Sequence, residues 1–151
     1  MHVFSRRYIV WGLVLAVAGV AIAAASQPMA AGGVPLAIKG YDPVAYFTQG
    51  KPARGLPDIE YEWDEHRYRF SSVAHRDLFK ADPVRYAPQF ANFCAMALTR
   101  GEVIGVNPEY WLISDGKLYI FGLQIGPELF QRHLAENLAK VDQNRWLVQS
   151  R

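Results

Sequence analysis

The chain has 151 residues, with 16 Lys and Arg, 14 Asp and Glu, and a single cysteine. Two of the basic residues, Arg6 and Arg7, precede an apolar N-terminal run, and the rest of the chain carries fourteen charges of each sign. This balance, without a dense Lys/Arg cluster, argues against binding to nucleic acid. One cysteine excludes an internal disulfide.

The N-terminal segment is typical of a signal for export. Arg6 and Arg7 are followed by an uncharged apolar run over residues 9–25 that ends in small residues. We expect residues 1–25 to be a signal peptide cleaved after Ala25, with an uncleaved membrane anchor as the alternative. Residues 5–9 also partly match a twin-arginine signal, so Sec export is favoured and Tat export stays open. The predicted location is the periplasm or another exported compartment, with membrane contact only through an uncleaved segment.

The remaining chain suits one domain. Residues 26–36 are small, contain Gly and Pro, and lack periodicity, so they predict a flexible lead-in to a domain over residues 37–151. A domain of this length can bury one hydrophobic core. Asp42 followed by Pro43 predicts the start of a short helix, with the acid as N-cap.

A first hairpin is predicted from alternation. Apolar and acidic side chains alternate over residues 59–64, which indicates a half-buried strand. A turn near Glu65 and His66 would return the chain through Tyr68 and Phe70. We therefore expect His66 to face water.

A helix should follow this hairpin. Ser71 or Ser72 is placed to cap a helix that ends at Lys80, with Leu78 and Phe79 toward the core.

The second half predicts a short turn, a hairpin and a final helix. Asp82-Pro83 begins a helical turn, whereas the apolar residues 90–98 are ambiguous between helix and buried strand. Residues 110–120, with Asp115-Gly116 at the centre, predict a hairpin with a type I′ turn. Residues 127–140 predict an amphipathic C-terminal helix. The fold class expected is a small α+β domain with two β-hairpins packed against short helices and this C-terminal helix.

The order of residues in 68–86 resembles the YHS domain. That segment reads YRFSSVAHRDLFKADPVRY, and segments 40–55, 92–101 and 115–121 are similar to those of exported bacterial YHS-domain proteins. The resemblance covers residues 37–146. The positions that fit the family's frame are Tyr68, Phe70, Ser72, Phe79, Pro83 and Tyr86. The resemblance implies the fold, an exported location and a link to metal handling.

The cysteines of the metal-binding members are missing here. Ser71, His75 and Ala45 occupy their positions, and of these only His75 can coordinate a soft ion. Cys94 and Met96 form a C-x-M pair, a thiolate and a thioether that favour Cu(I). We expect Cys94, Met96 and His75 to be the residues of any metal site, for Cu(I) or zinc. Equally open is that no ion binds and that Cys94 and Met96 fill the core.

Two functions follow. The resemblance implies an exported binding protein that handles copper or another soft metal and passes it to a partner protein. The alternative is a metal-free interaction or small-molecule-binding module, with aromatic residues such as Tyr41 and Tyr46 near Cys94 as its contact surface. The sequence contains no HExxH, CxxC, P-loop or GxGxxG motif, so we expect no enzyme.

Overall fold

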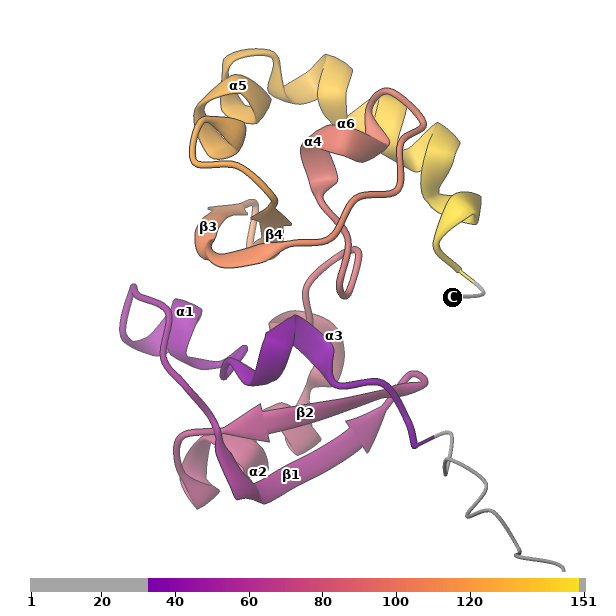
Figure 1. Ribbon diagram of the computed structural model, residues 1–151. Coiled ribbons are helices and arrows are strands. Elements are labelled where there is room, and N and C mark those ends of the chain that lie inside the picture. Colours follow the sequence, from indigo (N-terminus) through magenta and orange to yellow (C-terminus); the bar gives the residue numbers. More distant parts are fainter. Residues whose placement is uncertain (1–32, 150–151) are drawn as a thin grey trace, which may run out of the picture. The chain divides into compact units, whose positions relative to one another are not determined.

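The computed structural model describes residues 33–149 (Figure 1). The predicted signal peptide and most of the predicted lead-in lie outside these residues. The prediction of a small α+β domain with two hairpins and short helices is confirmed. In chain order, the elements are η1 (Ala37–Gly40), α1 (Ala45–Thr48), β1 (Leu56–Trp63), β2 (His66–Phe70), α2 (Val73–Ala81), α3 (Pro83–Tyr86), α4 (Ala95–Leu98), β3 (Asn107–Ser114), β4 (Lys117–Phe121), α5 (Gly126–Arg132), α6 (Leu134–Asn144) and η2 (Arg145–Leu147).

The first hairpin turns one residue earlier than predicted. Asp64 and Glu65 have φ of 48° and 59°, which suits a two-residue type I′ turn between the paired residues Trp63 and His66. His66 is therefore the first residue of β2, and it is only 9% exposed. The expectation that His66 faces water was wrong, because the turn ends at Glu65 and His66 is a strand residue paired with Trp63.

The helices after β2 begin at their predicted caps. The hydroxyl of Ser72 accepts a hydrogen bond of 3.1 Å from the backbone N–H of His75 at the start of α2. Phe79 on this helix is completely buried, whereas Leu78 is 43% exposed. Successive residues of a helix point about 100° apart, so only one of this neighbouring pair faces the core. Asp82 caps α3 in the same way.

The second hairpin has the predicted turn. Asp115 and Gly116 have φ of 49° and 67°, and the paired residues around them are Ser114 and Lys117. Side chains of β4 are buried on both faces of the strand. They alternate between two hydrophobic cores, so this hairpin is a layer shared by both.

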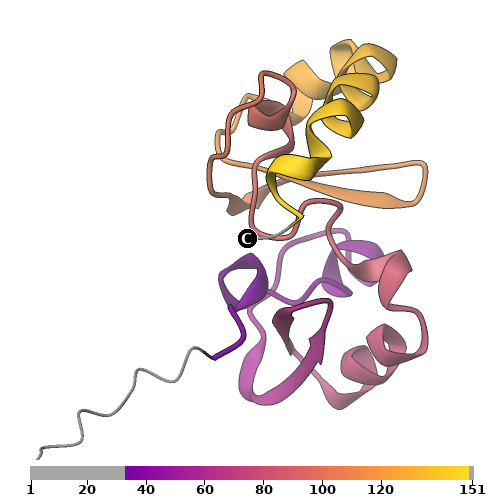
Figure 2. The same cartoon turned by 90° about the vertical axis from the view of Figure 1, so that its right-hand side faces the viewer.

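The first core lies against β1–β2, and the second lies against the C-terminal helices (Figure 1). Phe79 is central to the first core. The centroid of its ring lies 4.7 Å from that of the Tyr68 ring and 5.2 Å from that of the Phe70 ring. Leu118 and Ile120 of β4 join the first core, whereas Tyr119 and Phe121 join the second. Figure 2 shows the β3–β4 hairpin as a layer with α5 and α6 on one side of it.

The C-terminal segment is two helices. The expected single helix over residues 127–140 was wrong at His133, where φ of −127° and ψ of 46° separate α5 from α6. Asn137 of α6 is 5% exposed, and its side-chain amide donates to the carbonyl oxygens of Leu129 and Phe130. This polar side chain satisfies carbonyls that the end of α5 leaves without a partner.

Loop segments bind to one strand of each hairpin. The N–H of Arg67 in β2 donates to the carbonyl oxygen of Pro35, and the N–H of Gln89 donates to that of Leu118 in β4, both at 2.9 Å. Pro35 is therefore fixed to the domain although it falls in the predicted lead-in. In the part of the chain that the structure describes, no helix has the length and apolarity needed to span a membrane.

Candidate functional site

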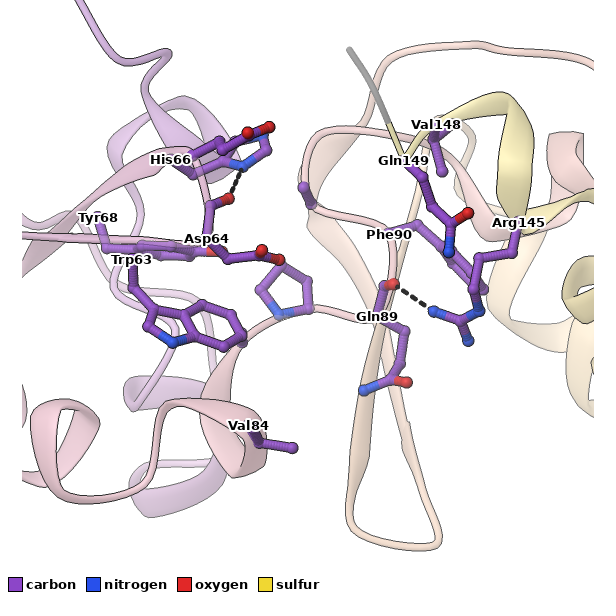
Figure 3. A pocket seen from close by; sticks show the side chains of 14 residues that line it. Trp63, Asp64, His66, Tyr68, Val84, Gln89, Phe90, Arg145, Val148 and Gln149 are labelled. Atoms are coloured by element: carbon purple, nitrogen blue, oxygen red, sulfur yellow. Dashed lines mark hydrogen bonds between the residues drawn. The ribbon is translucent and has the colours of Figure 1, made fainter.

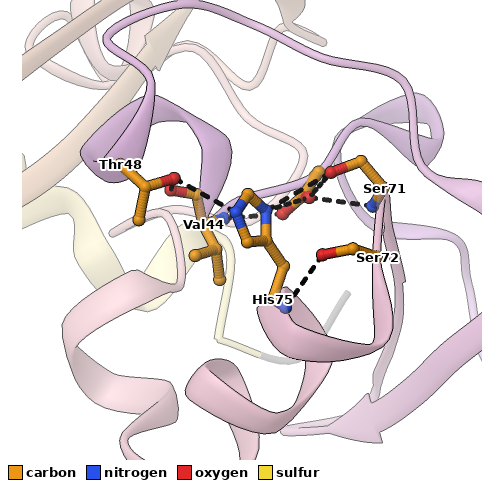
Figure 4. Close-up of polar contacts among 6 residues, drawn as sticks. Val44, Thr48, Ser71, Ser72 and His75 are labelled. Carbon is orange, nitrogen blue, oxygen red and sulfur yellow. Dashed lines mark hydrogen bonds and ion pairs between the residues drawn. The ribbon is translucent and has the colours of Figure 1, made fainter.

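A buried carboxylate, that of Asp42, is hydrogen-bonded to Ser71 and to His75. Figure 4 shows these two residues with Val44, Thr48 and Ser72 in one network of polar contacts. Asp42 is completely buried. One of its oxygens accepts a hydrogen bond of 2.9 Å from the N–H of Val44. The other accepts bonds from the N–H of Ser71 at 2.8 Å and from the Ser71 hydroxyl at 2.6 Å. Asp42 thus joins the chain before α1 to the residue that follows β2. The prediction that Asp42 is the N-cap of the following helix was wrong, because α1 begins at Ala45 and its N-cap is Val44.

His75 completes this network from α2. Its Nδ1 lies 2.6 Å from the same oxygen of Asp42, and its Nε2 lies 3.3 Å from the hydroxyl of Thr48. That hydroxyl donates to the carbonyl oxygen of Val44 at 3.1 Å, which leaves its lone pairs to accept from His75. The ring of His75 therefore lies between the carboxylate of Asp42 and the hydroxyl of Thr48. Both nitrogens that could ligate a metal already have partners.

The order Thr48, His75, Asp42 is that of a nucleophile, base and acid, but its contacts indicate a structural role. The hydroxyl proton of Thr48 is given to the backbone, so His75 does not accept it. Ser71 approaches the Nδ1 side of the ring, which Asp42 already occupies. The network therefore joins α1, β2 and α2.

Cys94 lies elsewhere, in the second core. It is 7% exposed and precedes α4, and its N–H donates to the carbonyl oxygen of Ile104 at 2.8 Å. Cys94 and Met96 line the same pocket, which has a volume of about 270 Å³. His75 is not among the lining residues, so the structure brings together two of the three predicted metal ligands. Within residues 33–149, no group of three or more His, Cys, Asp and Glu side chains is arranged to hold a metal ion.

The Cys94 pocket is apolar and has an exposed rim. Leu123 is 70% exposed, and Ile104 and Ile125 are each 48% exposed. Arg100 lies at the edge, where it donates to the carboxylate of Glu102 at 2.9 Å. This bond lowers the pKa of Glu102 below its usual value. Apart from Arg100, the side chains that line the pocket are hydrocarbon and sulfur.

A second cavity, of about 520 Å³, is a more polar cleft (Figure 3). Trp63 and His66 lie on one wall, and Phe90 and Arg145 lie on the other. Arg145 stacks 4.9 Å from the Phe90 ring and donates to the carbonyl oxygen of Gln89. His66 Nδ1 lies 2.9 Å from the carbonyl oxygen of Asp64. These polar groups bond within their own walls, and the apolar Cys94 pocket is the better candidate for a ligand.

The two tyrosines expected near Cys94 belong to the first core. The hydroxyl of Tyr46 donates to the carbonyl oxygen of Pro108 at 2.9 Å, and the side chain is 1% exposed. Burial raises the pKa of Tyr46. Tyr41 also lines a third pocket, which shares two glycines with the Cys94 pocket.

Comparison of the chain with models of protein families, with curated proteins and with solved structures finds no match.

Proposed function

We propose that this chain is an exported, YHS-type binding module that holds a small, largely apolar molecule in the Cys94 pocket. The observation that supports this proposal is the apolar pocket itself, concave and rimmed by exposed Ile104, Leu123 and Ile125. Binding sites for small molecules have this character, with mostly hydrophobic walls and few polar groups. The metal-free alternative is favoured over the three-ligand metal site because His75 binds Asp42 and not the Cys94 pocket.

Burial of the rim would drive binding. Each exposed rim side chain covered by a ligand removes apolar surface from water, which contributes about 25 cal/mol per Å². Three such side chains around one pocket supply a surface that a ligand can cover together with the pocket walls. The role is one of binding and delivery, without a chemical step.

Rim variants test the proposal. The exported protein, purified from the periplasmic fraction, is titrated with the neutral fluorescent probe N-phenyl-1-naphthylamine. We expect saturable one-to-one binding that Leu123→Gln and Ile125→Gln each weaken about five-fold, since each places a polar group at the apolar rim. Val84→Gln is the matched control, because Val84 is 72% exposed and lies outside this pocket.

The outcomes are distinct. Probe binding that falls in both rim variants and persists in Val84→Gln supports the proposal. Absence of binding, or equal binding by all four proteins, overturns it.

A second candidate is Cu(I) binding by Cys94 and Met96. It is favoured by one observation, that the thiol and the thioether line one pocket. An anaerobic titration of Cu(I) against a competing chelator tests it, with Cys94→Ser and Met96→Leu as variants and His75→Ala as control. Tight binding that Cys94→Ser abolishes and His75→Ala preserves would support a two-ligand site. Unchanged affinity in Cys94→Ser would exclude it.

A further inference from the structure

The third pocket adjoins the Cys94 pocket and has the opposite character. Its volume is about 560 Å³, and Lys39, Tyr41 and Arg54 line it. Gly105 and Gly122 line both pockets, so the two adjoin at these glycines. One side of this boundary is apolar and the other carries two cationic side chains.

Arg54 is held by an aromatic ring. Its guanidinium carbon lies 4.4 Å from the centre of the Tyr41 ring, a cation–π arrangement that leaves the edge of the guanidinium group to bind an anion. Neither Arg54 nor Lys39 forms a salt bridge with any carboxylate of residues 33–149. The nearest carboxylate that the contacts of this pocket identify is that of Glu109, which is bonded to the Tyr41 hydroxyl.

Tyr41 is fixed and uncharged. Its hydroxyl donates to the carboxylate of Glu109 at 2.7 Å, and this bond raises the pKa of Tyr41. The phenol therefore stays neutral at ordinary pH, and the negative charge beside it belongs to Glu109. Because Glu109 holds the hydroxyl, the ring is a fixed support for Arg54.

Both residues that line the two pockets are glycines, so neither places a side chain between the pockets. A Cβ added to Gly105 would meet no atom within 4 Å, so the space beside it is open. A Cβ added to Gly122 would lie 2.9 Å from the carbonyl oxygen of Gly105, which shows how closely the two backbones approach. A ligand that spans both pockets would pass beside Gly105.

We propose that the ligand of the Cys94 pocket is an organic carboxylate, with its apolar body in that pocket and its carboxylate between Arg54 and Lys39. This inference rests on the proposed function and names the class of its ligand. Arg54 suits a carboxylate because its planar fork can donate two parallel hydrogen bonds, and Lys39 adds a second positive charge. The apolar body gains the burial described above.

Three probes separate the parts of the ligand. Octanoate has the body and the charge, 1-octanol has the body alone, and acetate has the charge alone. Binding is followed by NMR through the amide resonances of Gly105 and Gly122, which lie at the boundary. We expect octanoate to bind at least five-fold more tightly than 1-octanol, and acetate to bind most weakly.

Charge variants then identify the head-group site. Arg54→Gln combined with Lys39→Gln should reduce octanoate affinity to that of 1-octanol and leave the affinity for 1-octanol unchanged. Lys117→Gln is the matched control, because it removes an exposed positive charge at the opposite end of the β3–β4 hairpin. Far-UV circular dichroism and thermal unfolding check that each variant is folded.

The results distinguish this inference from the function on which it rests. If 1-octanol binds as well as octanoate, or if the charge variants keep the preference for octanoate, the inference fails and the apolar pocket stands. If octanoate binds but Leu123→Gln and Ile125→Gln have no effect on it, the anion binds without the apolar pocket and both proposals fail. Absence of binding by octanoate and 1-octanol also overturns both.

Discussion

A buried carboxylate with four donors around it must stabilise the fold. Asp42 accepts from Val44 N–H, from the N–H and hydroxyl of Ser71, and from His75 Nδ1. Hydrogen bonds to a charged group contribute more than neutral ones, and removing one partner leaves the others buried without a partner. The energetic value of this network lies in joining three segments that are distant in the sequence.

Asp42→Asn should lower the free energy of unfolding by about 2–4 kcal/mol. The amide keeps one acceptor oxygen, but its NH₂ group cannot accept the hydrogen bonds that Asp42 accepts at both of its oxygens. Chemical denaturation measures the change. Asp82→Asn is the control, since Asp82 is an exposed N-cap with one bond, and Asn caps a helix equally well. Equal effects of the two substitutions would contradict a special role for Asp42.

Tyr41 offers a second test at the scale of one residue. The hydrogen bond to Glu109 is the largest cause of its raised pKa, and burial and the negative charge of Glu109 add to it. Glu109→Gln should therefore lower the pKa of Tyr41 toward its ordinary value of 10.0. An NMR pH titration with labelled tyrosine measures this, with Tyr41→Phe to assign the resonance. If the pKa of Tyr41 is unchanged in Glu109→Gln, the hydrogen bond to Glu109 is not the cause of the raised pKa.

At the scale of elements, two neighbouring glycines differ in whether a side chain would fit beside them. A Cβ at Gly122, just after β4, would clash with the carbonyl oxygen of Gly105, whereas a Cβ at Gly105 would meet open space. Gly122→Ala should therefore destabilise the fold by about 1–3 kcal/mol. Gly105→Ala should have little effect or stabilise by up to about 1 kcal/mol, because it restricts the unfolded chain.

Thermal and chemical unfolding of these two variants measure the difference. Because the substitution is Gly→Ala at both sites, the difference between the two changes in stability reflects the surroundings of each glycine. A similar loss in both variants would mean that backbone freedom, and not close approach, explains Gly122.

Local patterns predicted most of the elements. The Asp115-Gly116 turn and the caps at Ser72 and Asp82 depend on neighbouring residues, so they could be predicted from the sequence. The break at His133 could not, because it depends on Asn137 satisfying carbonyls of another helix. In the sequence, Asn137 stood out only as a polar residue on the apolar face of the predicted helix.

The candidate site depends on contacts between distant segments, which no local pattern reports. His75 was assigned with Cys94 because both could ligate a metal, yet His75 pairs with Asp42, 33 residues earlier in the chain. Lys39 and Arg54 were not predicted at all, since two isolated basic residues, 15 positions apart in the sequence, have no spacing that marks a site. The apolar residues Ala95, Ala97 and Leu98 next to Cys94 are buried in the second core. The exposed rim of the pocket instead comes from Ile104, Leu123 and Ile125, for which the sequence predicted no role.

At the scale of the whole molecule, two cores share one hairpin. Because β4 contributes Leu118 and Ile120 to the first core and Tyr119 and Phe121 to the second, loss of either core exposes one face of the same strand. The two halves should therefore unfold together, as expected for a small single domain. A polypeptide with two independent cores would unfold in two steps.

Phe130→Leu tests this coupling. Phe130 is fully buried in the second core, and its truncation should cost about 1–2 kcal/mol. Trp63 and Trp111 pack against the first core. Their fluorescence therefore reports that core once the other two tryptophans, Trp11 and the exposed Trp146, are replaced by Phe. We expect Phe130→Leu to shift the denaturation midpoint of this fluorescence as far as it shifts the midpoint by far-UV circular dichroism. A fluorescence midpoint that stays at its original value would show that the hairpin does not couple the cores.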